Sequence, residues 1–185
     1  DAVTLNYTWQ ANLNTSFTGE DLLYTRLKTG NFGPSNLKNS GGAYVNHANS
    51  NDDTIKVDKL WYQFPVGDNI KMWLGAKIEN YYMLASAPSI YKPVMKQFAL
   101  GGNGATYGSS TDGGFGVAWT QPVEDRSDAR WAVSTNYASK GASTASNDGG
   151  GMLSDASSKW LTKIEYGSPR WQVSFAVAKN MCDES

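Results

Sequence analysis

Apolar and polar residues alternate along most of the chain with the period of two that is typical of a β-strand. From Val3 to Phe17 the odd positions are almost all apolar or aromatic, and the even positions are all polar. Because successive side chains of a strand point to opposite faces, this pattern predicts a strand with one apolar and one polar face. The segment is far longer than the ~5–6 residues of an average globular strand.

The same alternation recurs and predicts about eight antiparallel strands in all. The later strands are expected at residues 23–28, 56–64, 70–78, 115–119, 131–137, 159–166 and 171–177. Short turns at 18–21, 65–69, 121–129 and 167–170 mostly alternate with long polar connections at 33–53, 79–112 and 139–156. Outer-membrane barrels have tight periplasmic turns and long external loops in this order. The predicted fold class is all-β, an antiparallel transmembrane β-barrel.

The whole chain, residues 1–185, is expected to form a single partial barrel domain. With the short turns in the periplasm, the first strand would begin outside the cell and the last would end there. Bacterial barrels have even strand numbers and both termini inside. Further strands are therefore expected before Asp1 and after Ser185.

The composition agrees with this fold class. The chain holds 19 Gly, 7 Trp and 10 Tyr at a mean hydropathy of -0.47. Only alternate residues of a barrel strand face lipid, so a low mean hydropathy is expected of such a protein. A net charge of -1 gives no general attraction to nucleic acid, which is not expected as a partner.

The sequence contains few residues of the types that usually catalyse reactions or bind metals. Cys182 is the only cysteine and His47 the only histidine, which excludes an intramolecular disulfide and a cysteine zinc site. A Ser-His-Asp triad could be built only on His47, and nothing in the sequence around it indicates one. We expect no enzyme activity, no metal and no cofactor.

Aromatic residues lie beside the short turns, on the apolar faces of their strands. Tyr and Trp favour the lipid–water interface because the ring is apolar and its polar group reaches water. The predicted membrane-interface girdle consists of Phe17, Phe64, Trp119, Trp131, Tyr166 and Trp171. The alternative is that these aromatics form the core of a β-sandwich.

The opposite faces of the strands are rich in cations. The residues predicted to line a pore are Arg26, Lys28, Lys59, Lys71, Trp73, Lys77, Lys159 and Lys163, with Glu165 as the clearest opposing charge. Lining charges select the ions that enter a water-filled pore, so this wall would favour small anions. The alternative is that these lysines are solvated and balanced by carboxylates elsewhere.

The connection from Glu79 to Asp112 is rich in aromatic residues for a solvated loop. It includes Tyr81, Tyr82 and Phe98. Such a segment either folds inward and narrows the pore or caps the barrel from outside, and its residues favour neither.

Two segments resemble the cyanobacterial outer-membrane porins, which are often described as iron-uptake or carbohydrate-selective-type porins. Residues 13–23 read LNTSFTGEDLL and are followed by Thr25-Arg26-Leu27 and Gly30-Asn31, and residues 57–68 read VDKLWYQFPVGD. The remainder of the chain is similar in pattern more than in letters.

The resemblance implies a barrel of roughly sixteen strands. It further implies a homotrimer in the outer membrane, in contact with its lipid, that passes small ions and hydrophilic solutes by passive diffusion. An S-layer-homology segment upstream would bind a peptidoglycan-linked polymer. That segment is not among these residues, and no set of iron ligands is visible.

A protein of another class also has to be considered. A soluble β-sandwich could bind carbohydrate by stacking exposed Trp and Tyr rings on sugar faces. Its aromatics should cluster in loops, whereas most Trp residues here lie on predicted strands. This carbohydrate-binding module is the alternative to the porin.

Overall fold

A computed structural model describes residues 3, 5–33, 45–108, 111–144, 151–152 and 157–181. Its strands are β1 (Thr8–Thr15), β2 (Leu22–Phe32), β3 (Asn49–Ser50), β4 (Lys56–Val66), β5 (Ile70–Ile78), β6 (Asp112–Thr120), β7 (Arg130–Ser139), β8 (Ser158–Ser168) and β9 (Trp171–Met181). Three short helices, η2 (Asn80–Tyr82), η3 (Lys96–Gly102) and α1 (Gly104–Tyr107), lie between β5 and β6. No helix among these residues is long and apolar enough to cross a membrane.

All strands belong to one antiparallel sheet, which confirms the all-β prediction. The order is β1-β2-β4-β5-β6-β7-β8-β9, and the short β3 pairs with β2. Each strand therefore pairs mainly with its neighbours in the sequence. The first strand is shorter than expected, because only Thr8–Thr15 of the 3–17 segment pairs with β2. Phe17 consequently lies in the following turn.

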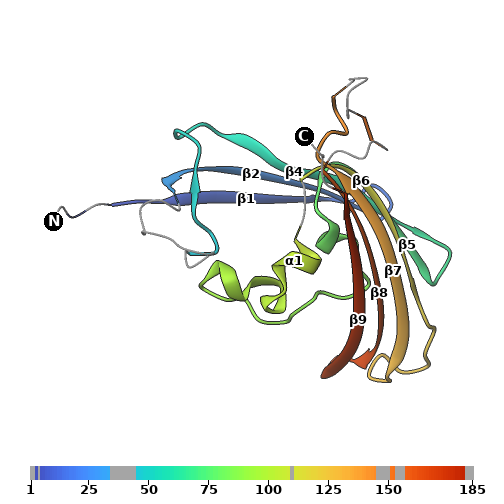
Figure 1. Cartoon of the computed structure of the whole chain (residues 1–185). Helices are drawn as coiled ribbons and strands as arrows, with labels where there is room; N and C mark the ends of the chain where they lie inside the picture. Colours follow the sequence, from blue (N-terminus) through green and yellow to red (C-terminus); the bar gives the residue numbers. More distant parts are fainter. Residues whose placement is uncertain are drawn as a thin grey trace.

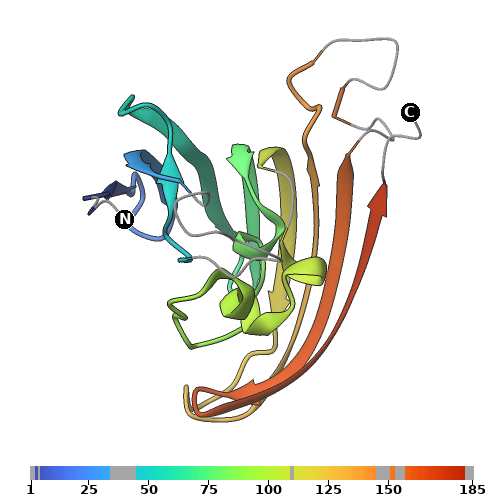
Figure 2. The ribbon, with the colours of Figure 1, turned by 60° about the vertical axis from the view of Figure 1, so that its left-hand side comes forward.

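The sheet curls strongly and remains open. Figures 1 and 2 show the strands wrapping around a concave side, on which the helices between β5 and β6 lie. Within the described residues β1 and β9 are the two edges and do not pair with each other. The sheet is therefore not closed into a barrel within the described residues.

The connections are sorted as the sequence predicts. Short turns join β1 to β2, β4 to β5, β6 to β7 and β8 to β9, whereas β2 to β4, β5 to β6 and β7 to β8 are joined by long segments. Because neighbouring strands are antiparallel, all short turns lie at one edge of the curved sheet and all long connections at the other.

The two faces of the sheet have opposite character. Register places Val133, Ile164 and Phe175 side by side on the convex face, and Ser134, Lys163 and Ala176 side by side on the concave face. Convex apolar residues at least 37% exposed include Leu13, Leu60, Val66, Ile70, Met72, Leu74, Phe115, Val133, Ile164, Val173, Phe175 and Val177. Concave residues at most 6% exposed include Lys59, Trp61, Trp73, Ile78, Ala118, Ala132, Ser134, Asn136, Ala138, Lys159, Leu161, Lys163 and Glu165.

A β-bulge near the end of β5 changes the alternation there. Gly75 pairs with Trp61, whereas Lys77 pairs with Leu60, so β5 carries one extra residue. The extra residue places Lys77 on the convex face of the sheet, beside Leu60. It places Ile78 on the concave face, where Ile78 is fully buried. The prediction that Lys77 shares the face of Lys71 is therefore wrong.

Gly75 is required at this bulge. A Cβ atom there would lie 2.7 Å from Cβ of Trp61 and 2.8 Å from Cβ of Ile78. Only glycine lets these two buried side chains approach the strand so closely.

Asp21 organises the turn between β1 and β2. Its carboxylate accepts hydrogen bonds from the Tyr62 hydroxyl (2.6 Å), the Ser16 hydroxyl (2.7 Å) and the backbone N–H of Thr18 (2.8 Å). These hydrogen bonds stabilise the ionised carboxylate and hold the pKa of Asp21 far below its usual range. The hydrogen bond from Tyr62 has the largest effect. The turn is thereby tied to β4 as well as to β2.

We expect Asp21→Asn to lower the free energy of unfolding at pH 7, measured by urea denaturation. The folded-state pKa of Asp21 is depressed, so its stabilisation is fully present above the unfolded pKa of about 3.9 and is lost as the pH falls below it. The difference between wild type and variant should therefore shrink below about pH 4.

The control is Asp68→Asn in the β4–β5 turn. Among the described residues Asp68 accepts no hydrogen bond, so its substitution should change the unfolding free energy little. Equal effects of both substitutions at pH 7 would contradict the role assigned to Asp21.

Candidate functional site

The concave face gathers most of the residues predicted to line a pore. Register and burial place there Arg26, Lys28, Lys59, Lys71, Trp73, Lys159, Lys163 and Glu165, and leave out only Lys77. Lys71 is exposed and Lys28 half-exposed, whereas Lys59, Trp73, Lys159 and Lys163 are buried. Most of these side chains are therefore covered by another part of the chain.

The cover is the segment between β5 and β6, described at residues 79–108 and 111, here called the inward segment. Figure 2 shows its helices within the curve of the sheet. The fully buried Asn80 donates to the side-chain oxygen of Asn136 (2.7 Å) and to the backbone oxygen of Lys159 (3.1 Å). Asn136 in turn donates to the backbone oxygen of Met83 (3.0 Å). The sequence leaves open whether this connection folds inward or caps the sheet from outside, and in the structure it folds inward.

Apolar packing fixes the inward segment further. Met83 is fully buried in a cluster with Trp61, Trp73 and Ile78. Gly116 of β6 makes room, since a Cβ atom there would lie 2.8 Å from Cβ of Met83. The segment is thus a packed layer on the sheet.

Two buried lysines anchor the inward segment. Lys163 is fully buried, forms an ion pair with Glu165, and donates to the hydroxyl (3.0 Å) and the backbone oxygen (3.2 Å) of Ser86. Lys159 donates to the backbone oxygens of Ala105 (2.6 Å) and Gly108 (2.5 Å). Sequence reasoning located both lysines on the polar face but could not identify these partners.

A mixed-charge network lies toward the long-connection edge. Lys59 lies 3.6 Å from Glu79 and 3.7 Å from Asp58, which also forms an ion pair with Arg26. The Thr111 hydroxyl accepts from Lys59 (3.2 Å) and donates to Glu79 (2.9 Å). Arg26 and Lys59 are thus balanced by carboxylates, as the alternative to a cationic pore wall predicts for such residues.

Tyrosines of the inward segment adjoin this network. The ring of Tyr82 packs 5.5 Å from Trp61 and 4.5 Å from Tyr81, and its hydroxyl accepts from Arg26 (3.0 Å). Burial raises the pKa of Tyr82 to about 12 and that of Tyr81 well above its usual range. Both hydroxyls remain neutral and serve as hydrogen-bonding groups.

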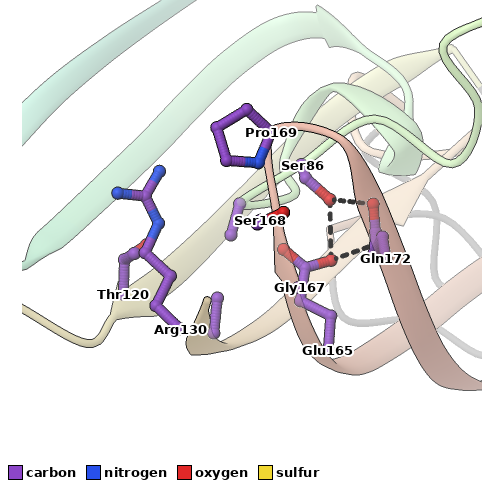
Figure 3. A pocket seen from close by; sticks show the side chains of 10 residues that line it. Ser86, Thr120, Arg130, Glu165, Gly167, Ser168, Pro169 and Gln172 are labelled. Carbon is purple, nitrogen blue, oxygen red and sulfur yellow. Dashed lines mark hydrogen bonds between the residues drawn. The ribbon is translucent and has the colours of Figure 1, made fainter. Parts of the chain in front are cut away.

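A pocket of about 280 Å³ lies at the short-turn edge of the concave face, shown in Figure 3. Strands β6 to β9 and the inward segment all contribute to it. Its lining residues are Ala85, Ser86, Thr120, Arg130, Ala132, Glu165, Gly167, Ser168, Pro169 and Gln172. Sequence reasoning missed Arg130, although alternation from Trp131 would have placed it on the polar face.

A second pocket of about 280 Å³ lies at the long-connection edge. Its lining includes Lys28, Lys56, Asp58, Lys77 and Thr111. Its lining comes from strands β2 to β5 and from Thr111, so this hollow lies at the rim of the sheet. Among the described residues, no group of three or more His, Cys, Asp or Glu side chains could hold a metal.

The predicted girdle residues line the short-turn edge of the convex side. Trp131 packs 4.9 Å from Tyr166, which packs 5.7 Å from Trp171, and each of the three is at least 36% exposed. Trp119 is 39% exposed on β6, and Phe64 stacks on Tyr62 with ring centroids 5.6 Å apart. Phe17 continues the row from its turn, 6.3 Å from Tyr62.

The comparison with known proteins gives one distant relative. The chain is 33% identical over 97 residues to uncharacterized protein sll0772 of Synechocystis sp.. The matched part covers 51% of this chain and 17% of that protein, so the chain spans only a small part of the relative's length. No family model matches the sequence, and no solved structure matches it.

We expect Lys163→Met to loosen the inward segment. The substitution leaves Glu165 buried without its ion-pair partner and removes two hydrogen bonds to Ser86. Trypsin cleavage after the exposed Lys96 should accelerate by about tenfold or more. The double variant Lys163→Met/Glu165→Gln should recover part of the protection because no buried charge is then left unpaired.

The control is Lys77→Met, the same change at an exposed lysine on the opposite face. It should cleave at the wild-type rate. Equal cleavage rates in Lys163→Met and wild type would show that Lys163 does not hold the segment.

Proposed function

We propose that this chain is part of the wall of an outer-membrane porin, a passive pore for small hydrophilic solutes and inorganic ions. The observation that carries the proposal is the inverted distribution of side chains. Large apolar residues are exposed on the convex face while lysines and a glutamate are buried on the concave face. A water-soluble protein is expected to have the reverse arrangement.

Surrounding lipid would account for the convex face. Val133, Ile164 and Phe175 lie side by side in adjacent strands and are 38%, 44% and 70% exposed. Such a band of apolar side chains, bordered by aromatic residues at the turn edge, is typical of the lipid-facing surface of a transmembrane barrel. The aromatic row from Phe17 to Trp171 would mark the periplasmic interface.

The sheet edges support a larger barrel. β9 spans 11 residues and carries large apolar side chains on its convex face, and in the described sheet one of its edges has no paired strand. Exposed edges of this kind tend to pair with another strand, and barrel closure removes them. We infer that further strands follow on both edges, in a barrel of roughly sixteen strands. A homotrimer and attachment to a peptidoglycan-linked polymer through an upstream segment complete the proposal by resemblance.

The inward segment would narrow the lumen of such a barrel. It fills part of the concave side through buried contacts of Asn80, Met83 and Ser86. Solutes would then pass along what remains open, past the exposed Lys71 and the two charged pockets. Small inorganic ions fit this course better than large solutes, and the surplus of cations favours anions.

Planar-bilayer conductance tests the proposal, using the full-length protein purified from outer membranes. Stable conductance steps, with a reversal potential in a salt gradient, are the expected result. Failure to conduct, combined with solubility without detergent, would contradict the porin and favour the soluble carbohydrate-binding module.

Replacing Lys71 by Gln should move the reversal potential toward that of an unselective pore. Lys71 is exposed beside the buried Ala118 on the concave face, so its charge acts on passing ions. Lys71→Arg keeps the charge and should keep the wild-type potential. If the Gln variant also behaves as wild type, the anion preference does not arise at Lys71.

A further inference from the structure

We propose that the pocket at the short-turn edge is a binding site for small oxyanions, and that Arg130 is the residue that recognises them. The inference rests on the proposed porin function and specifies one site along the pore. Arg130 differs from the neighbouring charged residues in having no partner for its side chain within the described part of the chain. Lys163 and Glu165 are fully engaged with each other and with Ser86, whereas the guanidinium of Arg130 has no ion pair or hydrogen bond among the described residues.

The position of Arg130 follows from register. Arg130 pairs with Gly167 at the start of β7, and Ala132 pairs with Glu165 one step further along the same face. Gly167 cannot carry a larger side chain, because a Cβ atom would lie 2.5 Å from the backbone oxygen of Trp171. The small residues Gly167, Ala132 and Ala85 leave the space into which the arginine side chain extends.

The opposite wall is polar but close to neutral. Ser86 and Gln172 each lie within hydrogen-bonding distance of Glu165, at 2.8 and 2.9 Å. The buried Lys163 compensates the charge of Glu165. Figure 3 shows this hydrogen-bonded group on one side of the pocket and the Arg130 guanidinium on the other. The pocket therefore carries about one net positive charge, located on Arg130.

The chemistry of arginine defines the class of ligand. A planar guanidinium presents parallel N–H donors that match two oxygens of a carboxylate or similar oxyanion, which a spherical halide cannot match. The hydroxyl groups of Thr120 and Ser168 also line the pocket and can donate. A volume of about 280 Å³ admits an ion of the size of nitrate or formate with some water. Pockets for larger organic ligands span ~300–1,000 Å³.

The test is the nitrate-to-chloride permeability ratio of the full-length porin in planar bilayers, from reversal potentials under biionic conditions. Arg130→Lys keeps the charge and loses the planar fork, so it should keep the chloride-over-potassium preference while the nitrate-to-chloride ratio falls about two- to fivefold. Arg130→Gln should reduce both quantities. Lys71→Gln, outside this pocket, should lower the general anion preference and leave the nitrate-to-chloride ratio unchanged.

The outcomes separate the site from the pore. Conducting Arg130→Lys channels with the wild-type nitrate-to-chloride ratio would overturn the oxyanion site and leave the porin intact. A wild-type protein that forms no channel would overturn the porin itself. If Arg130→Gln does not assemble, judged by heat-modifiable migration in gels, Arg130→Lys alone decides the question.

Discussion

The burial of Lys163 against Glu165 and Ser86 is the interaction on which the concave side of the sheet depends. A buried ammonium is costly unless it is paired and fully hydrogen-bonded. Glu165 lies two residues away on the same face of β8, but Ser86 comes from the connection between β5 and β6. The charge can therefore be satisfied only if that connection lies within the curve of the sheet. Its inward course in turn creates the pocket beneath Arg130 and covers Trp73.

The convex side follows the opposite physical rule. Its side chains are apolar, alternate with the buried polar ones and have no protein layer over them among the described residues. In water this surface would be a large exposed apolar patch, whereas in lipid it is the favoured surface of a barrel wall. Under the proposed function the convex face would meet lipid and the concave face water, and this difference connects the fold with the proposal.

Strict period-two alternation made the strands, the sorting of turns and the row of aromatics predictable from sequence. The prediction was wrong where a local irregularity intervened: a single extra residue after Gly75 turned Lys77 outward and Ile78 inward. The course of the inward segment could not be predicted, because it depends on hydrogen bonds between residues distant in sequence, such as Asn80 and Asn136. Arg130 was missed because it lies between the expected turn at 121–129 and the expected strand at 131–137, whereas in the structure it is the first residue of β7.

Contact of the convex face with lipid is the central claim, and tryptophan quenching by brominated phospholipids tests it most directly. Trp160 is 42% exposed on the convex face, whereas Trp73 is 3% exposed beneath the inward segment. In membranes containing the full-length protein, variants that retain only one of these tryptophans should differ sharply. Strong quenching of Trp160 with little quenching of Trp73 is the predicted result. Absence of quenching at Trp160 would contradict a lipid-facing convex surface.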